Sequence, residues 1–176
     1  MQIDGIADAH GGWLVNENDA LEEAACLYFI DAYNKSHGTH FEIKEHRDRP
    51  DFLVGASNTS ETMGVEVTYL YYDSEEAKTL LGRSSLPPHP DKEKNFDALA
   101  GRLNDLLMDK VKAAVAYDFG HKLFLLVRVA CPVFNKSDFE MCSDWIDLHS
   151  GNPFAEVWLL FYSEQTATFS DLLQIQ

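Results

Sequence analysis

The sequence predicts an α/β fold in which helices flank a mixed central β-sheet, and three observations support this. Residues 18–35 and 95–117 repeat apolar side chains at helical spacing. Three short strand patterns follow one another between residues 41 and 71, as in strands joined by hairpins. Residues 122–130 and 155–162 are almost continuously apolar, which is typical of strands covered on both faces. Adjacent strands followed by helical crossovers indicate helices packed around one sheet.

The first expected helix spans residues 18–35. Asn18 or Asp19 is suited to cap its N-terminus, and the acidic Glu22 and Glu23 favour the positive end of the helix dipole. Helical spacing then predicts a broad apolar stripe along one side of this helix: Leu21, Ala24, Ala25, Tyr28, Phe29 and Ala32.

Three strands are expected next. Residues 41–46 alternate apolar and polar side chains, residues 51–54 form a second short strand, and residues 63–71 are rich in β-branched and aromatic side chains. A polar loop of turn-forming residues joins the second strand to the third. Alternation in the third strand places Glu66 and Thr68 on one face. It places four larger side chains on the other face: Met63, Val65, Val67 and Tyr69.

The rest of the chain adds helices and strands around this unit. Residues 74–81 predict a short helix, and the three prolines in residues 84–90 predict an irregular loop. The helix over residues 95–117 is expected to carry a stripe of Phe96, Leu99, Leu103, Leu106, Leu107, Lys110, Val111 and Ala114. Residues 137–146 predict a short helix capped by Ser137. The tail predicts a last half-buried turn around Phe169, Leu172 and Leu173.

The length of 176 residues favours a single domain. Residues 1–16 lack a clear period and predict a loose N-terminal arm, residues 19–129 hold the core elements, and residues 130–176 supply a helix and a strand that complete the sheet. No apolar run approaches the roughly 20 residues of a membrane span, and the N-terminus lacks the layout of a signal peptide. We therefore expect a cytoplasmic protein.

The cysteines and histidines favour structural interpretations. Cys26 and Cys131 lie within apolar patterns, so we expect buried reduced thiols rather than a disulfide or a zinc site. His37, His40 and His46 fit no tight metal-ligand spacing, and we interpret them as surface residues.

The formal charge is −15, from 14 Lys and Arg against 29 Asp and Glu. Such a charge disfavours broad nucleic-acid affinity, because neutralisation of phosphates supplies most non-specific binding. It is compatible with a local basic groove, or with nucleic acid held mainly through a bound metal. It also fits a basic protein surface as the partner.

Two carboxylates come together at the centre of the predicted strands. Asp51 begins the second strand after Pro50, and Glu66 lies inside the third. Carboxylates held on rigid strands are what a hard divalent cation needs. The alternatives are that Asp51 only caps a turn and that Glu66 only faces solvent. The neighbours of Glu66 are apolar or β-branched, where an unpartnered charge costs free energy.

The order helix, strand, Pro50-Asp51, hairpin, Glu66-Val67-Thr68, long helix and buried strand resembles the PD-(D/E)XK nuclease superfamily. The resemblance covers roughly residues 19–129, about two thirds of the chain. It implies a restriction-endonuclease-like fold, a three-layer sandwich with a central mixed sheet flanked by helices. Many members act as dimers, so the resemblance leaves a homodimer open.

The resemblance also implies a set of metal ligands. Asp51 matches the first acidic ligand of the superfamily, Glu66 matches the second, and the backbone carbonyl of Val67 would be the third. A glutamate on the first helix often joins the site, which here means Glu22 or Glu23, and we take Glu23 as the candidate. Such a site would bind Mg²⁺, or Mn²⁺ in its place, and activate a water for phosphodiester hydrolysis.

The chain departs from the superfamily at one position. The superfamily places a lysine two residues after the glutamate, where this chain has Thr68, and threonine supplies no positive charge. Lys110 is the first candidate for a lysine that has moved, because helical spacing aligns it with the apolar stripe of its helix. Lys44, beside Asp51, is the second candidate, whereas Lys112 points about 200° away from Lys110.

Two functions follow as hypotheses. The first is a Mg²⁺-dependent nuclease that cleaves DNA or RNA, with Asp51, Glu66 and Lys110 as catalytic residues. The second is an inactive protein of nuclease fold that serves as an acidic binding partner, of the immunity or antitoxin type, or as a nucleic-acid mimic. Three tyrosines either stack on bases or pack in the core: Tyr69, Tyr71 and Tyr72.

Overall fold

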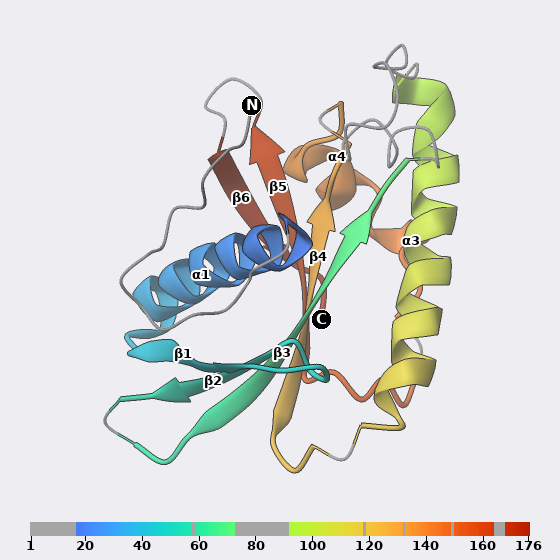
Figure 1. The fold of residues 1–176 in the computed structure, drawn as a ribbon. Coiled ribbons are helices and arrows are strands. Elements are labelled where there is room, and N and C mark those ends of the chain that lie inside the picture. Colours follow the sequence, from blue (N-terminus) through green and yellow to red (C-terminus); the bar gives the residue numbers. More distant parts are fainter. Residues whose placement is uncertain are drawn as a thin grey trace, which may run out of the picture.

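A computed structural model describes most of the chain, and residues 17 and 92–95 are described by their backbone alone. The described residues are 17–57, 59–72, 92–117, 119–131, 133–148, 150–163 and 168–176. They form an α/β structure with one six-stranded mixed sheet and helices packed against it (Figure 1). No helix in these ranges has both the length and the apolar composition needed to cross a membrane.

The described elements follow one another in a simple order. They are α1 (Glu17–His37), β1 (Phe41–His46), β2 (Phe52–Ala56), β3 (Thr62–Leu70), α3 (Lys92–Ala114), β4 (Lys122–Val129), α4 (Lys136–Met141), the 3₁₀ helix η1 (Ser143–Trp145), β5 (Glu156–Ser163) and β6 (Thr168–Gln174). The strands lie in the sheet in the order of the sequence. Strands β3, β4 and β5 are parallel, whereas β1, β2 and β6 pair antiparallel with their neighbours.

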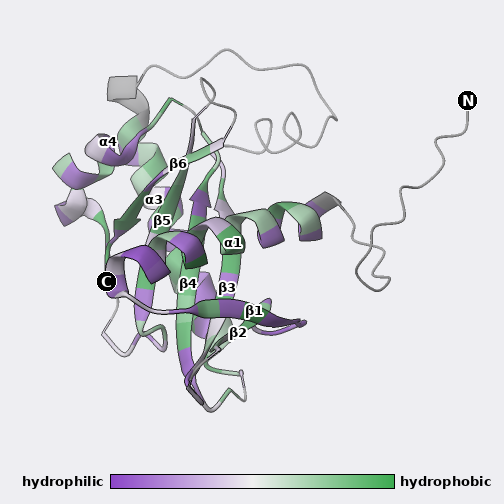
Figure 2. Ribbon diagram, turned by 90° about the vertical axis from the view of Figure 1, so that its left-hand side faces the viewer, coloured by the Kyte–Doolittle hydropathy of each residue, from purple (hydrophilic) through white to green (hydrophobic). Residues whose placement is uncertain are grey.

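The sheet buries an apolar cluster on each face. On one face, α1 packs on β2, β3 and β4 through residues that include Phe29, Phe52, Val65 and Phe124. On the other face, α3 and α4 pack on β4 and β5 through residues that include Leu103, Phe139, Leu125 and Leu159. Figure 1 shows α1 lying across the sheet and α3 running along the other side. Figure 2 shows the central strands coloured mainly hydrophobic and the edge strand β1 mainly hydrophilic.

The first helix forms where the sequence predicts it, and its buried face only partly overlaps the predicted stripe, through Ala25 and Phe29. Ala25, Cys26, Phe29 and Ile30 are buried, whereas the predicted stripe member Leu21 is 37% exposed. The helix is apolar on more than one side, so its periodicity does not determine which side meets the sheet. The helix also begins at Glu17, so the residues expected to cap it lie inside its first turn.

Two expectations for the C-terminal part are wrong. The tail forms β6, a strand that pairs antiparallel with β5, rather than a half-buried turn. The sequence of β6 alternates only weakly between apolar and polar side chains, so its pattern did not predict a strand. The strand forms mainly through its pairing with β5 and only partly through a buried face. Asn135, not Ser137, caps α4: its side chain accepts from the Asp138 backbone N–H, and the Asp138 carboxylate accepts from the Asn135 N–H.

Several expectations fall outside the described residues. These are the N-terminal arm over residues 1–16, the short helix over residues 74–81 and the proline-rich loop over residues 84–90. Among the described cysteines, Cys26 and Cys131 are buried within the two apolar clusters, as expected from their surroundings.

Candidate functional site

The two predicted carboxylates meet where β2 begins beside β3. Phe52 pairs with Val65, so continuing this antiparallel register by one residue brings Asp51 opposite Glu66. The Val67 backbone N–H donates to Asp51 Oδ2 at 2.7 Å, which fixes the carboxylate against β3. The sequence therefore placed the pair correctly because a short hairpin dictates which residues oppose each other.

The turn before Asp51 is held by two close contacts. The Arg47 N–H donates to the Asp51 carbonyl oxygen at 2.7 Å, which closes the turn between β1 and β2. Gly64 lies under this turn, and a Cβ added there would lie 2.6 Å from both Pro50 Cγ and Phe119 Cε1. The absence of a side chain at Gly64 thus lets Pro50 and Phe119 approach β3 and sets the position of Asp51.

Glu66 is buried, and its two carboxylate oxygens have different surroundings. Oε1 accepts hydrogen bonds from Lys110 Nζ at 2.8 Å and from the Tyr117 hydroxyl at 3.0 Å. Oε2 is buried without a hydrogen-bond partner among the described residues. Buried carboxylate oxygens are normally satisfied, so the lone pairs of Oε2 remain available to a ligand.

Lys110 is the lysine that reaches the carboxylates. It extends from α3 to Glu66, and its side chain is 24% exposed against 6% for Glu66. The other lysines considered from the sequence lie elsewhere: Lys44 pairs with Glu42, and Lys112 pairs with Asp109 at 3.5 Å. Lys110 therefore places a positive charge at Glu66 from another element, while the buried Thr68 carries none.

Burial and neighbouring negative charge both favour the protonated form of the Asp51 carboxyl group and so raise its pKa. Burial, and then the charge of Glu66, raise the pKa of Asp51 to about 7, although the hydrogen bond from Val67 opposes this rise. Burial, and then Glu66, also raise the pKa of Tyr117, so its hydroxyl keeps the proton that it donates. The ammonium of Lys110 also lowers the pKa of Asp51, but its effect is the smallest of those acting on this carboxyl group. A divalent cation would supply the missing positive charge.

The first helix contributes Glu22 to this electrostatic environment. Burial, and then Asp19, raise the pKa of Glu22, and Glu66 and Lys110 also act on it. Glu22 in turn raises the pKa of Asp51. Glu23, which the sequence nominated as a ligand, is exposed. Successive helical residues point about 100° apart, so only one of these two can face the carboxylates.

A second group of ligand-type side chains adjoins the first. One ligand atom each of Asp19, Glu22 and His46 lies within 4.8 Å of the others. His46 ends β1, and its ring stacks on Phe52 at 4.9 Å between centroids. His46 is exposed, as the sequence analysis expected of a surface residue, whereas Asp19 was expected to cap the first helix. The only signal in the sequence for this group was the alternation in β1. Alternation within one strand does not indicate that α1 brings Asp19 and Glu22 to the end of that strand.

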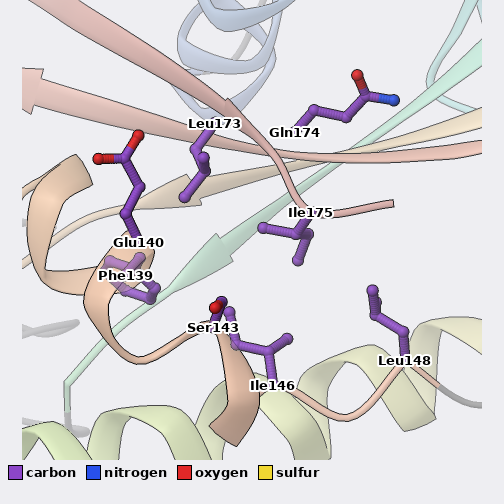
Figure 3. A pocket seen from close by; sticks show the side chains of 8 residues that line it. All are labelled: Phe139, Glu140, Ser143, Ile146, Leu148, Leu173, Gln174 and Ile175. Carbon is purple, nitrogen blue, oxygen red and sulfur yellow. The ribbon is translucent and has the colours of Figure 1, made fainter.

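One cavity lined by described residues lies away from these carboxylates. It has a volume of about 310 Å³ and lies between α4, η1 and the end of β6 (Figure 3). Leu173 and Ile175 point toward α4 and η1, whereas Gln174 points away. Its walls are mostly apolar and include one carboxylate, Glu140. Among the described residues that line it, Glu140 has no second ionisable side chain beside it to form a catalytic pair or a set of metal ligands.

The donor set of the carboxylate site suits a hard divalent cation. Asp51, the free Oε2 of Glu66 and the neighbouring Glu22 supply oxygen atoms, which Mg²⁺ and Mn²⁺ prefer. The resemblance nominated the Val67 carbonyl as a ligand, and the contact that the structure gives for Val67 is a hydrogen bond from its backbone N–H to Asp51.

No protein-family model matches the chain, and comparisons with curated proteins and with solved structures found no match either.

Proposed function

We propose that this protein is a divalent-metal-dependent nuclease with a restriction-endonuclease-like fold. The element order α1, β1, β2, β3, α3, β4 supports the proposed fold, since it is the order on which the PD-(D/E)XK resemblance depends. The observation that carries the proposal is the contact between Lys110 and Glu66, 2.8 Å long and next to Asp51. It supplies the positive charge that the sequence lacks at Thr68.

Each residue then has a distinct role. Asp51, Oε2 of Glu66 and Glu22 would hold Mg²⁺, which supplies an activated water and offsets charge on the phosphate. Asp51 stays oriented by the N–H of Val67. Lys110 uses one of its three N–H donors on Glu66, so the others can reach an attacking water or a phosphate oxygen. Tyr117 holds Glu66 in place from the side of α3.

The partial exposure of Lys110 matters for this role. Its side chain is 24% exposed, so the ammonium remains accessible from solvent while it stays bonded to Glu66. An ammonium in this position can stabilise negative charge that develops on the substrate without first breaking its ion pair. The geometry thus fits hydrolysis of a phosphodiester, in which positioning and charge stabilisation provide most of the catalysis.

Calorimetric titration with Mg²⁺ and Mn²⁺ tests the metal site. Wild type should bind one ion, and Asp51→Asn should abolish binding. Asp31→Asn is the matched control, because Asp31 is an exposed carboxylate of α1 that pairs with Lys35. Equal binding by wild type and Asp51→Asn would refute the proposed site.

Cleavage assays test the chemistry. Labelled single- and double-stranded DNA and RNA should be cleaved by wild type in Mn²⁺ and left intact by Lys110→Met. Lys112→Met should cleave as wild type does, because Lys112 is exposed and pairs with Asp109. An active Lys110→Met variant would remove Lys110 from the mechanism.

One observation favours the second hypothesis, an inactive acidic binding partner. Glu66 Oε1 accepts from both Lys110 and Tyr117, so this half of the carboxylate is already satisfied without a metal. The charge of −15 would suit a basic protein surface. This alternative predicts no metal binding at millimolar Mg²⁺ and tight association with a basic protein. Detection of Asp51-dependent cleavage would exclude it.

A further inference from the structure

Arg47 lies in the turn between β1 and β2, next to the carboxylate site. Its backbone N–H donates to the Asp51 carbonyl oxygen at 2.7 Å, which fixes its backbone relative to the proposed metal ligand. Its guanidinium carbon lies 5.9 Å from the ring centre of Phe119. The residue is exposed. Both the backbone and the side chain of an exposed arginine are therefore held beside Asp51.

The ring beneath Arg47 lies on the same face of the sheet as Glu66. Side chains two residues apart on a strand point to the same face, so a Cβ at Gly64 would point to the face of Glu66. That Cβ would lie 2.6 Å from Phe119 Cε1. Phe119 also packs against the apolar cluster that α3 forms with the sheet, which is the side from which Lys110 reaches Glu66. Gly64, where the ring meets β3, is about 7 Å along the strand from Glu66.

Most of the donors of Arg47 remain available to a ligand. Within the described ranges its side chain has one ion pair, in which Nε lies 3.9 Å from a carboxylate oxygen of Glu45. This distance is too long for a hydrogen bond, and the Arg47 and Glu45 side chains are 36% and 58% exposed, so the pair contributes little. A guanidinium has five N–H donors, and two of them can bind one phosphate side by side.

A strand bound at the carboxylate site needs positive charge beyond the metal and Lys110. Lys110 is bonded to Glu66, so its charge acts at the phosphodiester that is cleaved. The neighbouring phosphate would meet a chain with a formal charge of −15. The exposed Glu45 and Asp48 flank Arg47 in sequence, so this part of the surface is not generally basic. A phosphate would therefore be bound by direct contact with the guanidinium rather than by a broad positive field.

We propose that Arg47 binds a phosphate of the substrate strand beside the phosphodiester held at Asp51 and Glu66. The guanidinium would take two phosphate oxygens with two parallel N–H donors, while its contact with the Phe119 ring limits its motion. This inference rests on the proposed nuclease function and identifies where the strand continues past the metal site. A contact to phosphate carries no sequence information, so it applies equally to DNA and RNA.

The first test measures binding by anisotropy over a range of salt concentrations, in EDTA so that the strand stays intact. The probe is whichever of a single- and a double-stranded labelled oligonucleotide wild type binds more tightly. Arg47→Gln should weaken binding about fivefold or more at low salt, and it should reduce the slope of log affinity against log salt by about 0.7 for a single strand or 0.9 for a duplex. Arg102→Gln, the same charge change at an exposed position of α3, should bind as wild type does. Equal effects of the two variants, or an unchanged slope in Arg47→Gln, would overturn the proposal.

A second variant separates phosphate binding from packing of the turn. Arg47→Lys keeps the positive charge but cannot form the two-donor contact. It should keep the salt slope of wild type and bind with an affinity between those of wild type and Arg47→Gln. Urea unfolding should give the same stability for all three proteins, because the side chain is exposed and its ion pair is weak. Equal losses of affinity in both Arg47 variants, each accompanied by a loss of stability, would assign the side chain to packing and overturn the proposal.

Cleavage assays in Mn²⁺ separate this inference from the proposed function. Arg47→Gln should raise KM about fivefold or more and change kcat by about twofold or less, because it removes binding common to the substrate and the transition state. Cleavage that Asp51→Asn abolishes, with a wild-type KM in Arg47→Gln, would retain the nuclease and overturn the phosphate contact. A reduced salt slope in Arg47→Gln, with no cleavage by wild type, would retain the phosphate contact and overturn the nuclease.

Discussion

Lys110 Nζ lies 2.8 Å from Glu66 Oε1 and joins α3 to β3 across 44 residues of sequence. Tyr117 donates to the same oxygen from beyond the end of α3. The two contacts make Glu66 the point at which the second long helix is tied to the sheet. The same pair provides a test of stability that does not depend on any activity.

Lys110→Met should destabilise the protein by about 1–3 kcal/mol, because it leaves the Glu66 carboxylate buried with only the Tyr117 hydroxyl as its partner. Urea unfolding measures this loss. Lys112→Met is the control, since its exposed pair with Asp109 contributes about 0.5 kcal/mol or less. Adding Glu66→Gln to Lys110→Met should recover part of the loss. Equal effects of the two single lysine variants would contradict this prediction.

Asp51 should make the metal-free protein less stable as the pH rises from about 4 to 7. The unfolded chain loses the proton of this carboxyl near pH 4, whereas the folded protein holds it until about pH 7. The free energy of unfolding therefore falls as the pH rises through this window. Above about pH 7 both states have lost the proton, and the free energy no longer changes with pH because of Asp51. Asp51→Asn removes the effect, so urea unfolding should show the variant gaining on wild type by on the order of 2–4 kcal/mol between these pH values. A constant difference between the two proteins would refute the raised pKa.

Metal binding should depend on pH in the opposite sense. A cation and a proton compete for Asp51, so Mn²⁺ affinity should rise by roughly tenfold per pH unit below pH 7 and level off above it. Calorimetry in buffers of different ionisation enthalpy should also detect about one released proton near pH 6. A pH-independent affinity would show that the cation does not displace the proton of Asp51.

Glu22→Gln should weaken Mn²⁺ binding more than Glu23→Gln does. Glu22 interacts with Asp51 and Glu66, whereas Glu23 is exposed on the same turn of α1. We expect a loss of about tenfold or more for the first change and about twofold or less for the second, since each carboxylate ligand adds to the affinity of such sites. The reverse order would restore Glu23 as the helical ligand.

Gly64→Ala should destabilise the protein by about 1–3 kcal/mol, because the new methyl group would overlap Pro50 and the ring of Phe119. It should also weaken Mn²⁺ binding by shifting the turn that holds Asp51. Gly101→Ala is the matched control: its Cβ meets nothing within 4 Å, and it lies in α3. That change should stabilise the helix by about 0.5–1 kcal/mol. Thermal unfolding and calorimetry of both variants check the pair.

Local periodicity was enough to determine several features from the sequence alone. The positions of the first five strands and of the two long helices follow from alternation and helical spacing. Strand alternation also placed Glu66 on the face opposite Val65 and Val67, and helical spacing placed Lys110 on the side of α3 that meets the sheet. These features depend on neighbours within about ten residues, so the sequence contains them directly.

Tertiary structure decided what depends on packing between distant segments. The buried side of α1 depends on how that helix lies on the sheet, since the helix is apolar on several sides. The same placement makes Glu22, not Glu23, face the carboxylates and brings His46 beside Asp19. Strand β6 exists through its pairing with β5, and Arg128 of β4 lies over aromatic rings from β3, β5 and β6. Local sequence determined which side chains are available, and long-range packing determined which of them meet.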